Sequence, residues 1–164
     1  MQQWYVVHTQ ARQEARAELN LRRQGFEAWL PLFRVARRHA RRIDHVMAPL
    51  FPRYLFVHLD LSVQPWRAIN GTFGVVRLLC NRDIPLLVPE GLVEEIMQRC
   101  DESGTVVLSP RGLAVGDSVK VATGPFADLA GLFQTMSRRD RVVLLIKLLG
   151  REVRATVAFR DLAA

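Results

Sequence analysis

The sequence predicts an α+β protein in which an antiparallel sheet flanked by helices is followed by a small barrel of five short strands. Residues 1–100 alternate short β-favouring runs with two helical patterns, which is typical of helices packed on a sheet. Residues 101–111 are polar and contain Gly and Pro, as linkers do. From residue 112 the hydrophobic period changes to two. We therefore expect a domain at 1–100, a linker at 101–111 and a second domain at 112–164.

The first domain is expected to open with a strand over residues 3–9, where the side chains alternate between two faces. Thr9 is expected to cap a helix over residues 10–24, since Thr is a favoured N-cap residue. Apolar residues spaced four apart should face the core from this helix: Ala11, Ala15 and Leu19.

The rest of the first domain reads as further strands and two helices. Pro65 suits the first position of a short helix over residues 65–70, and Pro89 that of a longer helix ending near Cys100. Strands or extended segments are expected at residues 26–30, 53–59, 75–79 and 85–88.

The segment Pro49–Val57 is the most informative part of the chain. Its two prolines stiffen the entry and exclude a central strand there. In the strand that follows, Tyr54 and Phe56 point to one face, while aliphatic residues point to the other: Leu55, Val57 and Leu59. The aliphatic face is expected to be core. The aromatic face suits a partner surface, and core packing would explain it as well.

The chain is basic, with a net charge of +7. Residues 1–100 contribute +5 of this, from 14 Arg against 9 acidic residues, and residues 101–164 contribute +2, from 9 basic against 7 acidic residues. A basic surface attracts polyanions, although proteins of ribosomes and of membrane surfaces share this sign. Residues 34–45 alone hold five arginines, which fits either a solvated hairpin or a contact with nucleic acid.

Three features together carry a resemblance to a known family. Trp4 and Tyr5 precede Glu14 in the first helix, residues 49–56 read P-x-x-P-x-Y-x-F, and residues 116–131 look like a KOW motif. The chain therefore resembles the NusG/RfaH family of transcription elongation factors, and in length and layout an RfaH-like specialised NusG paralogue. The resemblance implies an NGN-like first domain that binds RNA polymerase, and an SH3-like KOW barrel.

The same resemblance implies three binding surfaces. The RNA polymerase clamp would contact the aromatic face, through Phe51, Tyr54 and Phe56. The non-template DNA strand would contact the first helix and the turn Ile69–Gly74, through Arg16, Arg23, Gln24, Asn70 and Thr72. A small-subunit ribosomal protein or the termination factor Rho would contact a loop of the barrel, formed by Gly124, Pro125 and Phe126.

The expected function is transcription elongation and antitermination by a monomer that suppresses pausing or termination and recruits a partner through the KOW domain. An RNA-binding or ribosome-associated KOW protein is the alternative. No enzyme, cofactor or metal is expected, since catalytic motifs are absent and Cys80 and Cys100 lack neighbouring ligands. The sequence has no signal peptide and no apolar run of about 18 residues, so a cytoplasmic location without membrane contact is expected.

The fold of the second domain is open at one point. Strands are expected at Leu132–Met136, Val142–Leu148 and Val153–Ala158, but the apolar run 141–149 has no period that separates a buried strand from a helix. In RfaH-like members this domain can fold as a helical hairpin that covers the aromatic face. Ala48 stands where that subfamily often has an acid, which removes one interdomain ion pair. The overall layout nevertheless favours a docked, helical form.

Overall fold

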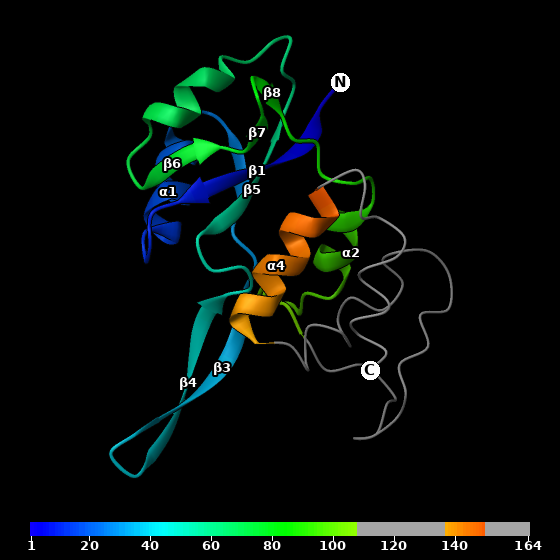
Figure 1. The fold of residues 1–164 in the computed structure, drawn as a ribbon. Coiled ribbons are helices and arrows are strands. Elements are labelled where there is room, and N and C mark those ends of the chain that lie inside the picture. Colours follow the sequence, from blue (N-terminus) through cyan, green and yellow to red (C-terminus); the bar gives the residue numbers. More distant parts are fainter. Residues whose placement is uncertain (108–136, 150–164) are drawn as a thin grey trace.

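The computed structural model describes residues 1–107 and 137–149, and it confirms the α+β class. Its main sheet has four antiparallel strands in the order β2-β5-β1-β6 (Figure 1). These strands are β1 (Gln3–Thr9), β2 (Glu27–Trp29), β5 (Tyr54–Leu59) and β6 (Val75–Leu78). Two further sheets are two-stranded, β3 (Leu32–His39) with β4 (Arg42–Pro49) and β7 (Cys80–Asn81) with β8 (Ile84–Pro85). The strands expected at residues 3–9, 26–30, 53–59 and 75–79 are confirmed to within one residue at each end, and of the segment expected at 85–88 only Pro85 lies in a strand.

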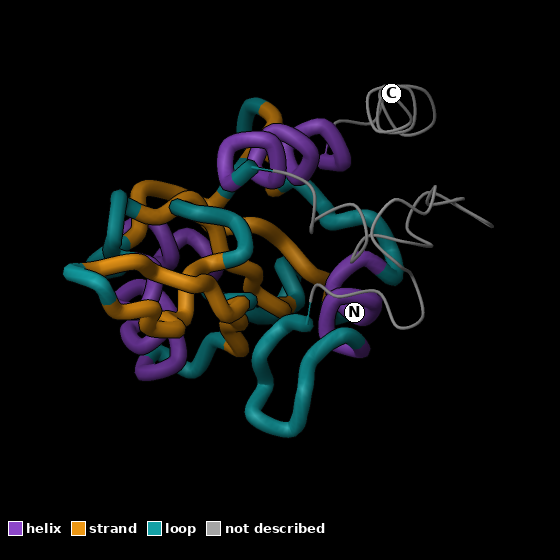
Figure 2. Tube along the Cα trace, turned by 90° about the horizontal axis from the view of Figure 1, so that it is seen from below, coloured by secondary structure: helices purple, strands orange, loops and turns teal. Residues whose placement is uncertain are grey.

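The main sheet buries both of its faces. On one face, the aliphatic residues of β5 form a core with α1 (Glu14–Arg23), including Leu55, Val57 and Leu59. On the other face, Phe56 belongs to a second core with α2 (Leu92–Gln98) and α4 (Arg138–Leu149). Figure 2 shows α4 along one side of the strands. The alternation of aromatic and aliphatic residues in β5 therefore separates two cores. The aliphatic core was predicted, and the aromatic face, for which a partner surface or core packing was expected, is packed in this structure.

Helix α1 begins later than the sequence predicted, and Thr9 does not cap it. Arg12 adopts a left-handed backbone (φ 62°), so the chain turns once more before the helix starts. The N-cap residue is Gln13, without a hydrogen bond from its side chain. Thr9 instead ends β1, where it is fully buried. The strand ends at Thr9 as expected, and the turn at residues 10–13 that follows it delays the start of the helix, which explains the error.

The core-facing side of α1 was also assigned to the wrong residues. The side chains of Ala11, Ala15 and Leu19 are exposed. The buried positions are Ala17 and Leu21, with Glu14 one turn earlier on the same face. Ala11 lies outside the helix, so the series counted from it follows the wrong stripe. The arginines of α1 remain exposed, as expected.

The β3–β4 hairpin projects from the body (Figure 1). Its ladder runs in register from the pair Leu32–Pro49 to the pair His39–Arg42. Ala40 and Arg41 form the turn, both with positive φ (45° and 68°), which closes the hairpin in two residues. Only the root is buried, and the arginine-rich far end is exposed.

The expected helices at 65–70 and 89–100 are both present, the first shifted by one residue and the second shorter. Residues Trp66–Gly71 make a 3-10 helix, η1, directly after Pro65. The second, α2, begins after Gly91, whose left-handed backbone (φ 85°) sets the N-cap. Beyond α2, Val106 is buried in the core of α2 and α4 and its N–H donates to the carbonyl oxygen of Leu32 at 2.8 Å. Part of the expected linker thus packs on the body, and the domain boundaries stay a prediction.

Of the two interpretations left open for residues 141–149, the docked helix is confirmed and the strand at Val142–Leu148 is wrong, because these residues lie within α4. Ser137 caps this helix, since its Oγ accepts from the N–H of Asp140 at 3.2 Å and donates to the Asp140 carboxylate at 2.7 Å. Leu144, Leu145 and Leu149 are buried against the body. Each buried leucine contributes about 1.5–3 kcal/mol, which outweighs a helix penalty of about 0.7 kcal/mol or less for each valine or isoleucine. The other two strand candidates lie outside the described residues.

The docking of α4 can be tested through its most buried leucine. Leu145 is 1% exposed, so Leu145→Ala should lower the free energy of undocking by about 2–5 kcal/mol. Ile146 is its neighbour on the solvent side, at 41% exposure, and Ile146→Ala is the matched control. Hydrogen exchange of the α4 amides measures the difference, because a docked helix opens locally. Equal exchange in the two variants would contradict the docking described here.

Candidate functional site

The aromatic face of β5 is built by cross-strand pairing with β1. Tyr54 lies opposite His8 and Phe56 lies opposite Val6, so these side chains share one face of the sheet. The rings of Tyr54 and His8 stack with centroids 5.0 Å apart. Phe56 meets Phe51 edge-on at 5.9 Å. The structure therefore brings together all three residues expected at the polymerase surface.

These three residues differ in exposure. Phe51 and Phe56 are buried, at 1% and 0%, in the core that also contains the leucines of α4. Tyr54 is half-buried and packs against the edge of the same core. The aromatic face is thus covered in this structure, with Tyr54 the most accessible of the three.

His8 is held in its neutral form beside Tyr54. Burial lowers the pKa of its imidazole below the usual value, and the nearby charges of Arg53 and Arg77 lower the pKa further. A neutral ring stacks on Tyr54 without bringing an uncompensated charge to the aromatic face. Sequence analysis placed His8 in the strand but gave it no role at the site.

Arg141 fastens α4 to the root of the β3–β4 hairpin. Its Nε donates to the carbonyl oxygen of Leu50 at 2.9 Å, and its guanidinium lies 4.5 Å from the centroid of the Phe33 ring. Burial, followed by the nearby charge of Arg138, lowers the pKa of Arg141. The side chain is 4% exposed. Sequence analysis missed it because nothing in the sequence shows that residue 141 reaches a carbonyl 91 positions away.

The residues expected to contact DNA gather where the end of α1 meets the turn after η1. The Nε2 of Gln24 donates to the Oγ1 of Thr72 at 2.7 Å, and this hydroxyl donates to the carbonyl oxygen of Ala68 at 3.1 Å. The Oδ1 of Asn70 accepts from the N–H of Leu78 at 2.8 Å. Three of the five expected residues therefore carry internal hydrogen bonds that shape the turn.

The remaining two expected residues, Arg16 and Arg23, are exposed on α1. Beside them lies Phe73, which the sequence analysis missed. Its ring is 72% exposed and lies 5.4 Å from the guanidinium carbon of Arg16. The signal was present in the sequence, because an aromatic residue between Thr72 and Gly74 in a tight turn has little room to point inward.

Gly74 fixes the turn against α1. Its backbone has φ 88°, and a Cβ built there would lie 3.0 Å from the backbone N of Ala17 and from the carbonyl oxygen of Gln13. Both neighbours are backbone atoms, so neither can move aside as a side chain would. The close approach of turn and helix thus requires glycine at this position.

The remaining expectations concern the barrel loop, metal ions, the two cysteines and membrane spans. Gly124, Pro125 and Phe126 lie outside the described residues. Within the described ranges, no group of three or more His, Cys, Asp or Glu side chains is arranged to hold a metal ion. Cys80 and Cys100 are half-buried free thiols, and burial raises the pKa of each. In the described part of the chain, no helix is both long and apolar enough to span a membrane.

Comparison with known proteins gives one consistent family. The family model described as "NusG: Transcription termination factor nusG" matches residues 2–97. The transcription termination/antitermination protein NusG of Thermus thermophilus is 29% identical, over 96% of this chain and 95% of its own length. The corresponding protein of Deinococcus radiodurans is 28% identical, over 98% of each chain.

Among solved structures, one described as "Domain interaction in Thermotoga maritima NusG" is similar with a TM-score of 0.45 and 22% identity. The similarity covers 78% of this chain and 76% of that one.

The requirement for glycine at residue 74 gives a test of how the turn is held on α1. Gly74→Ala should destabilise the protein by about 2 kcal/mol or more, since it combines a left-handed backbone with backbone contacts at 3.0 Å. Gly71→Ala, in the same turn, is the control, because its Cβ would meet nothing within 4 Å and should change stability by about 0.5 kcal/mol at most. Chemical denaturation of both variants measures the difference, and similar midpoints would refute the close approach.

Proposed function

The chain belongs to the NusG family, and we propose that this transcription factor acts during elongation by binding the RNA polymerase clamp through the aromatic face of β5. In this proposal residues 1–100 form the polymerase-binding domain, residues 101–111 the linker and residues 112–164 a KOW domain. Binding to the clamp would disfavour the opened, paused polymerase, so the factor would suppress pausing or termination by binding energy alone.

The observation that carries the proposal is the helix seated on the aromatic face. Helix α4 buries Leu144, Leu145 and Leu149 in the core that contains Phe51 and Phe56. A sheet face that accepts one apolar helix has the shape and chemistry to accept another, as grooves that bind amphipathic helices do. The helices of the polymerase clamp would then occupy the place that α4 occupies here.

This arrangement implies competition between α4 and the polymerase. Only a form with α4 displaced can present Phe56 to a partner, so the docked form would be autoinhibited. The apparent affinity for polymerase equals the affinity of the open form multiplied by the fraction of molecules in that form. Ala48 cannot supply an ion pair to hold α4, and the contacts of Arg141 with Leu50 and Phe33 support docking instead.

We assign the second contact, with the non-template DNA strand, to the surface formed by α1 and the turn after η1. Arg16 and Arg23 would attract phosphates, and the exposed ring of Phe73 would stack on an unpaired base. Gln24, Asn70 and Thr72 would keep the turn in shape through their internal hydrogen bonds. Gln24 and Asn70 are exposed and would present their remaining polar atoms, whereas Thr72 is buried and would act through the shape of the turn. The KOW domain, with its loop at residues 124–126, would recruit a small-subunit ribosomal protein or Rho.

Competition at the aromatic face predicts that Leu145→Asp raises the affinity for polymerase and that Tyr54→Ala lowers it. Leu145→Asp should displace α4 and raise the affinity for core RNA polymerase at least about tenfold, whereas Ile146→Asp on the exposed side should leave it near the wild-type value. Adding Tyr54→Ala to Leu145→Asp should then reduce the affinity, because Tyr54 loses its contact with the clamp. Leu19→Ala, at an exposed position of α1, is the control for Tyr54→Ala.

Equilibrium binding to purified core polymerase measures these affinities, with circular dichroism to confirm folding. The proposal fails if displacement of α4 leaves the affinity unchanged. Binding to ribosomal subunits but not to polymerase would favour a ribosome-associated module instead.

The DNA contact predicts a change in salt dependence. Arg23→Ala should lower the slope of log affinity against log salt by about 0.7 in a complex with an exposed non-template strand, the value for one phosphate contact on single-stranded DNA. Phe73→Ala should weaken binding about fivefold or more without changing this slope, since stacking contributes about 1–3 kcal/mol per base. Arg82→Ala, an exposed charge in the turn between β7 and β8, is the control. Unchanged slope and affinity in both variants would identify a merely solvated surface.

A further inference from the structure

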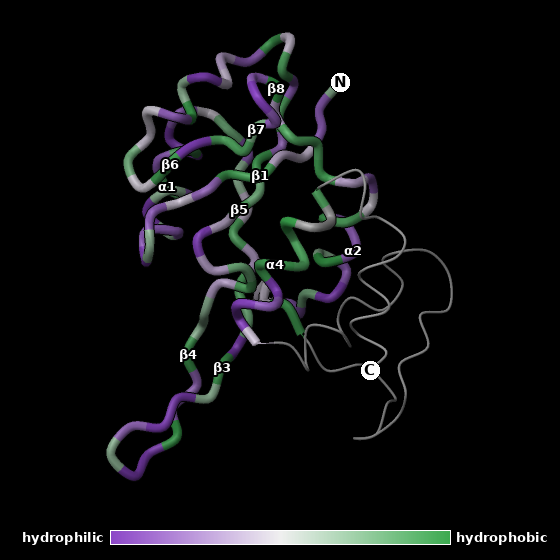
Figure 3. Tube along the Cα trace, in the orientation of Figure 1, coloured by the Kyte–Doolittle hydropathy of each residue, from purple (hydrophilic) through white to green (hydrophobic). Residues whose placement is uncertain are grey.

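The far end of the β3–β4 hairpin concentrates positive charge that nothing in the body neutralises. Residues 34–45 hold five arginines and one aspartate, a net charge of +4 from 5 − 1 with His neutral. All of these residues except Val35 are exposed. In Figure 3 the hairpin is coloured mainly as hydrophilic toward its tip, in contrast to α4. A stable, solvated hairpin does not need this excess, and like charges so close together oppose its folding.

The arginines divide into two groups by their acidic neighbours. Arg37, in the third pair from the tip, lies directly opposite Asp44 in the ladder. Arg34 lies near Asp101, whose pKa is lowered by hydrogen bonds from Ser103 and Thr105 and also by the charge of Arg34. At the tip, the opposite residues are uncharged or a histidine: Ile43 faces Arg38, and His39 faces Arg42. The unbalanced charge therefore lies on Arg38, Arg41 and Arg42.

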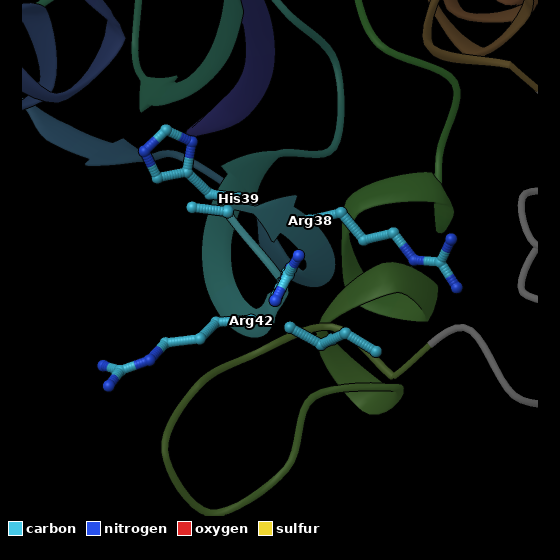
Figure 4. A pocket seen from close by; sticks show the side chains of 6 residues that line it. Arg38, His39 and Arg42 are labelled. Atoms are coloured by element: carbon cyan, nitrogen blue, oxygen red, sulfur yellow. The ribbon is translucent and has the colours of Figure 1, made fainter.

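These three arginines surround one hollow at the end of the hairpin. The hollow has a volume of about 330 Å³ and is lined by residues 38–43, with no acidic residue among them. Arg38 and Arg42 leave the hairpin in opposite directions (Figure 4), as expected for residues on the two faces of one ribbon. A polyanion that received the tip would be contacted from both sides.

The apolar content of the tip is too small for a protein interface. The only large hydrophobic side chain exposed among residues 38–43 is Ile43. Specific protein interfaces require an apolar or aromatic centre surrounded by polar residues. Arginine, by contrast, is the side chain that binds phosphate with two parallel hydrogen bonds.

We propose that the tip of the β3–β4 hairpin binds duplex DNA, with Arg38, Arg41 and Arg42 contacting the phosphates on both sides of the major groove. The groove of B-form DNA is about 12 Å wide and admits a two-stranded β-ribbon. A ribbon inserted there directs its two faces toward the two groove walls, where the phosphates of opposite strands lie. Duplex RNA would be a poorer ligand, since its major groove is too deep and narrow for side chains to read.

This surface lies on a different element from the proposed polymerase and single-strand contacts, which are on β5, α1 and the turn after η1. The inference does not depend on the proposed function. It is tested on the full chain without polymerase, so the failure of one leaves the other unaffected.

The experiment compares two pairs of substitutions that remove the same charge. Arg38→Gln with Arg42→Gln, the tip pair, removes unbalanced charge. Arg34→Gln with Arg37→Gln, called the root pair because it lies nearer the root, removes charge that has acidic neighbours. Fluorescence anisotropy with a DNA duplex of about 20 base pairs is recorded from about 50 to 200 mM salt, a range in which phosphate contacts dominate affinity. The same-sequence RNA duplex and single DNA strand serve as further ligands, and thermal melting confirms folding.

We expect the tip pair to lower the slope of log affinity against log salt by about 1.8, which corresponds to two phosphate contacts at about 0.9 each. The root pair should lower it by less than half of that, and the affinity lost in the tip pair should be larger for the DNA duplex than for both other ligands. The proposal is overturned by equal losses in the two pairs, by an unchanged slope in the tip pair, or by a larger loss in the tip pair for RNA or for single strands than for the DNA duplex. Loss of polymerase affinity in the tip pair, with DNA binding intact, would assign the hairpin to a protein partner.

Discussion

The burial of β5 on both faces is the constraint on which the rest of the structure depends. Its aliphatic face is covered by α1, and its aromatic face needs a cover because Phe56 lies at the centre of the sheet beside Val6. An exposed aromatic face of this size would be costly for a single molecule in water. The chain meets this requirement with α4, which comes from a distant part of the sequence. While α4 covers the aromatic face of β5, that face is not available to another protein.

The order of the elements in the first domain could be predicted because each is marked locally. Alternation identified β1 and β5, and prolines placed η1 and α2. The buried face of α1 could not be predicted, since it depends on an extra turn at Arg12 that delays the start of the helix. For helix α4 the sequence left two interpretations open, because its valines and isoleucine favoured a strand and the overall layout favoured a docked helix. The capping pair Ser137 and Asp140 was a signal for helix, but the burial that decides the outcome comes from tertiary packing.

The candidate site shows the same division between local and distant information. Period two placed Tyr54 and Phe56 on one face, and the spacing of Asn70, Thr72 and Gly74 placed a turn beside α1. The burial and hydrogen bonding of these residues could be seen only in the structure. Two of the three aromatic residues are buried, and the polar side chains of the turn form internal hydrogen bonds. Phe73 and Arg141 were missed because the roles we give them depend on exposure and on a contact across the sequence.

The β3–β4 hairpin is attached at its root and projects from the other described elements at its tip. Its root is held by Phe33, which lies under the guanidinium of Arg141, and by the hydrogen bond between Val106 and Leu32, while its far end projects away from the other described elements (Figure 1). Eight residues per strand give an arm of about 27 Å, at about 3.4 Å per residue. A rotation of about 10° at the root therefore carries the tip through about 5 Å, which is roughly the spacing of adjacent strands. Because α4 contacts the root of the hairpin, undocking of α4 would displace the tip of the hairpin more than any other part of it.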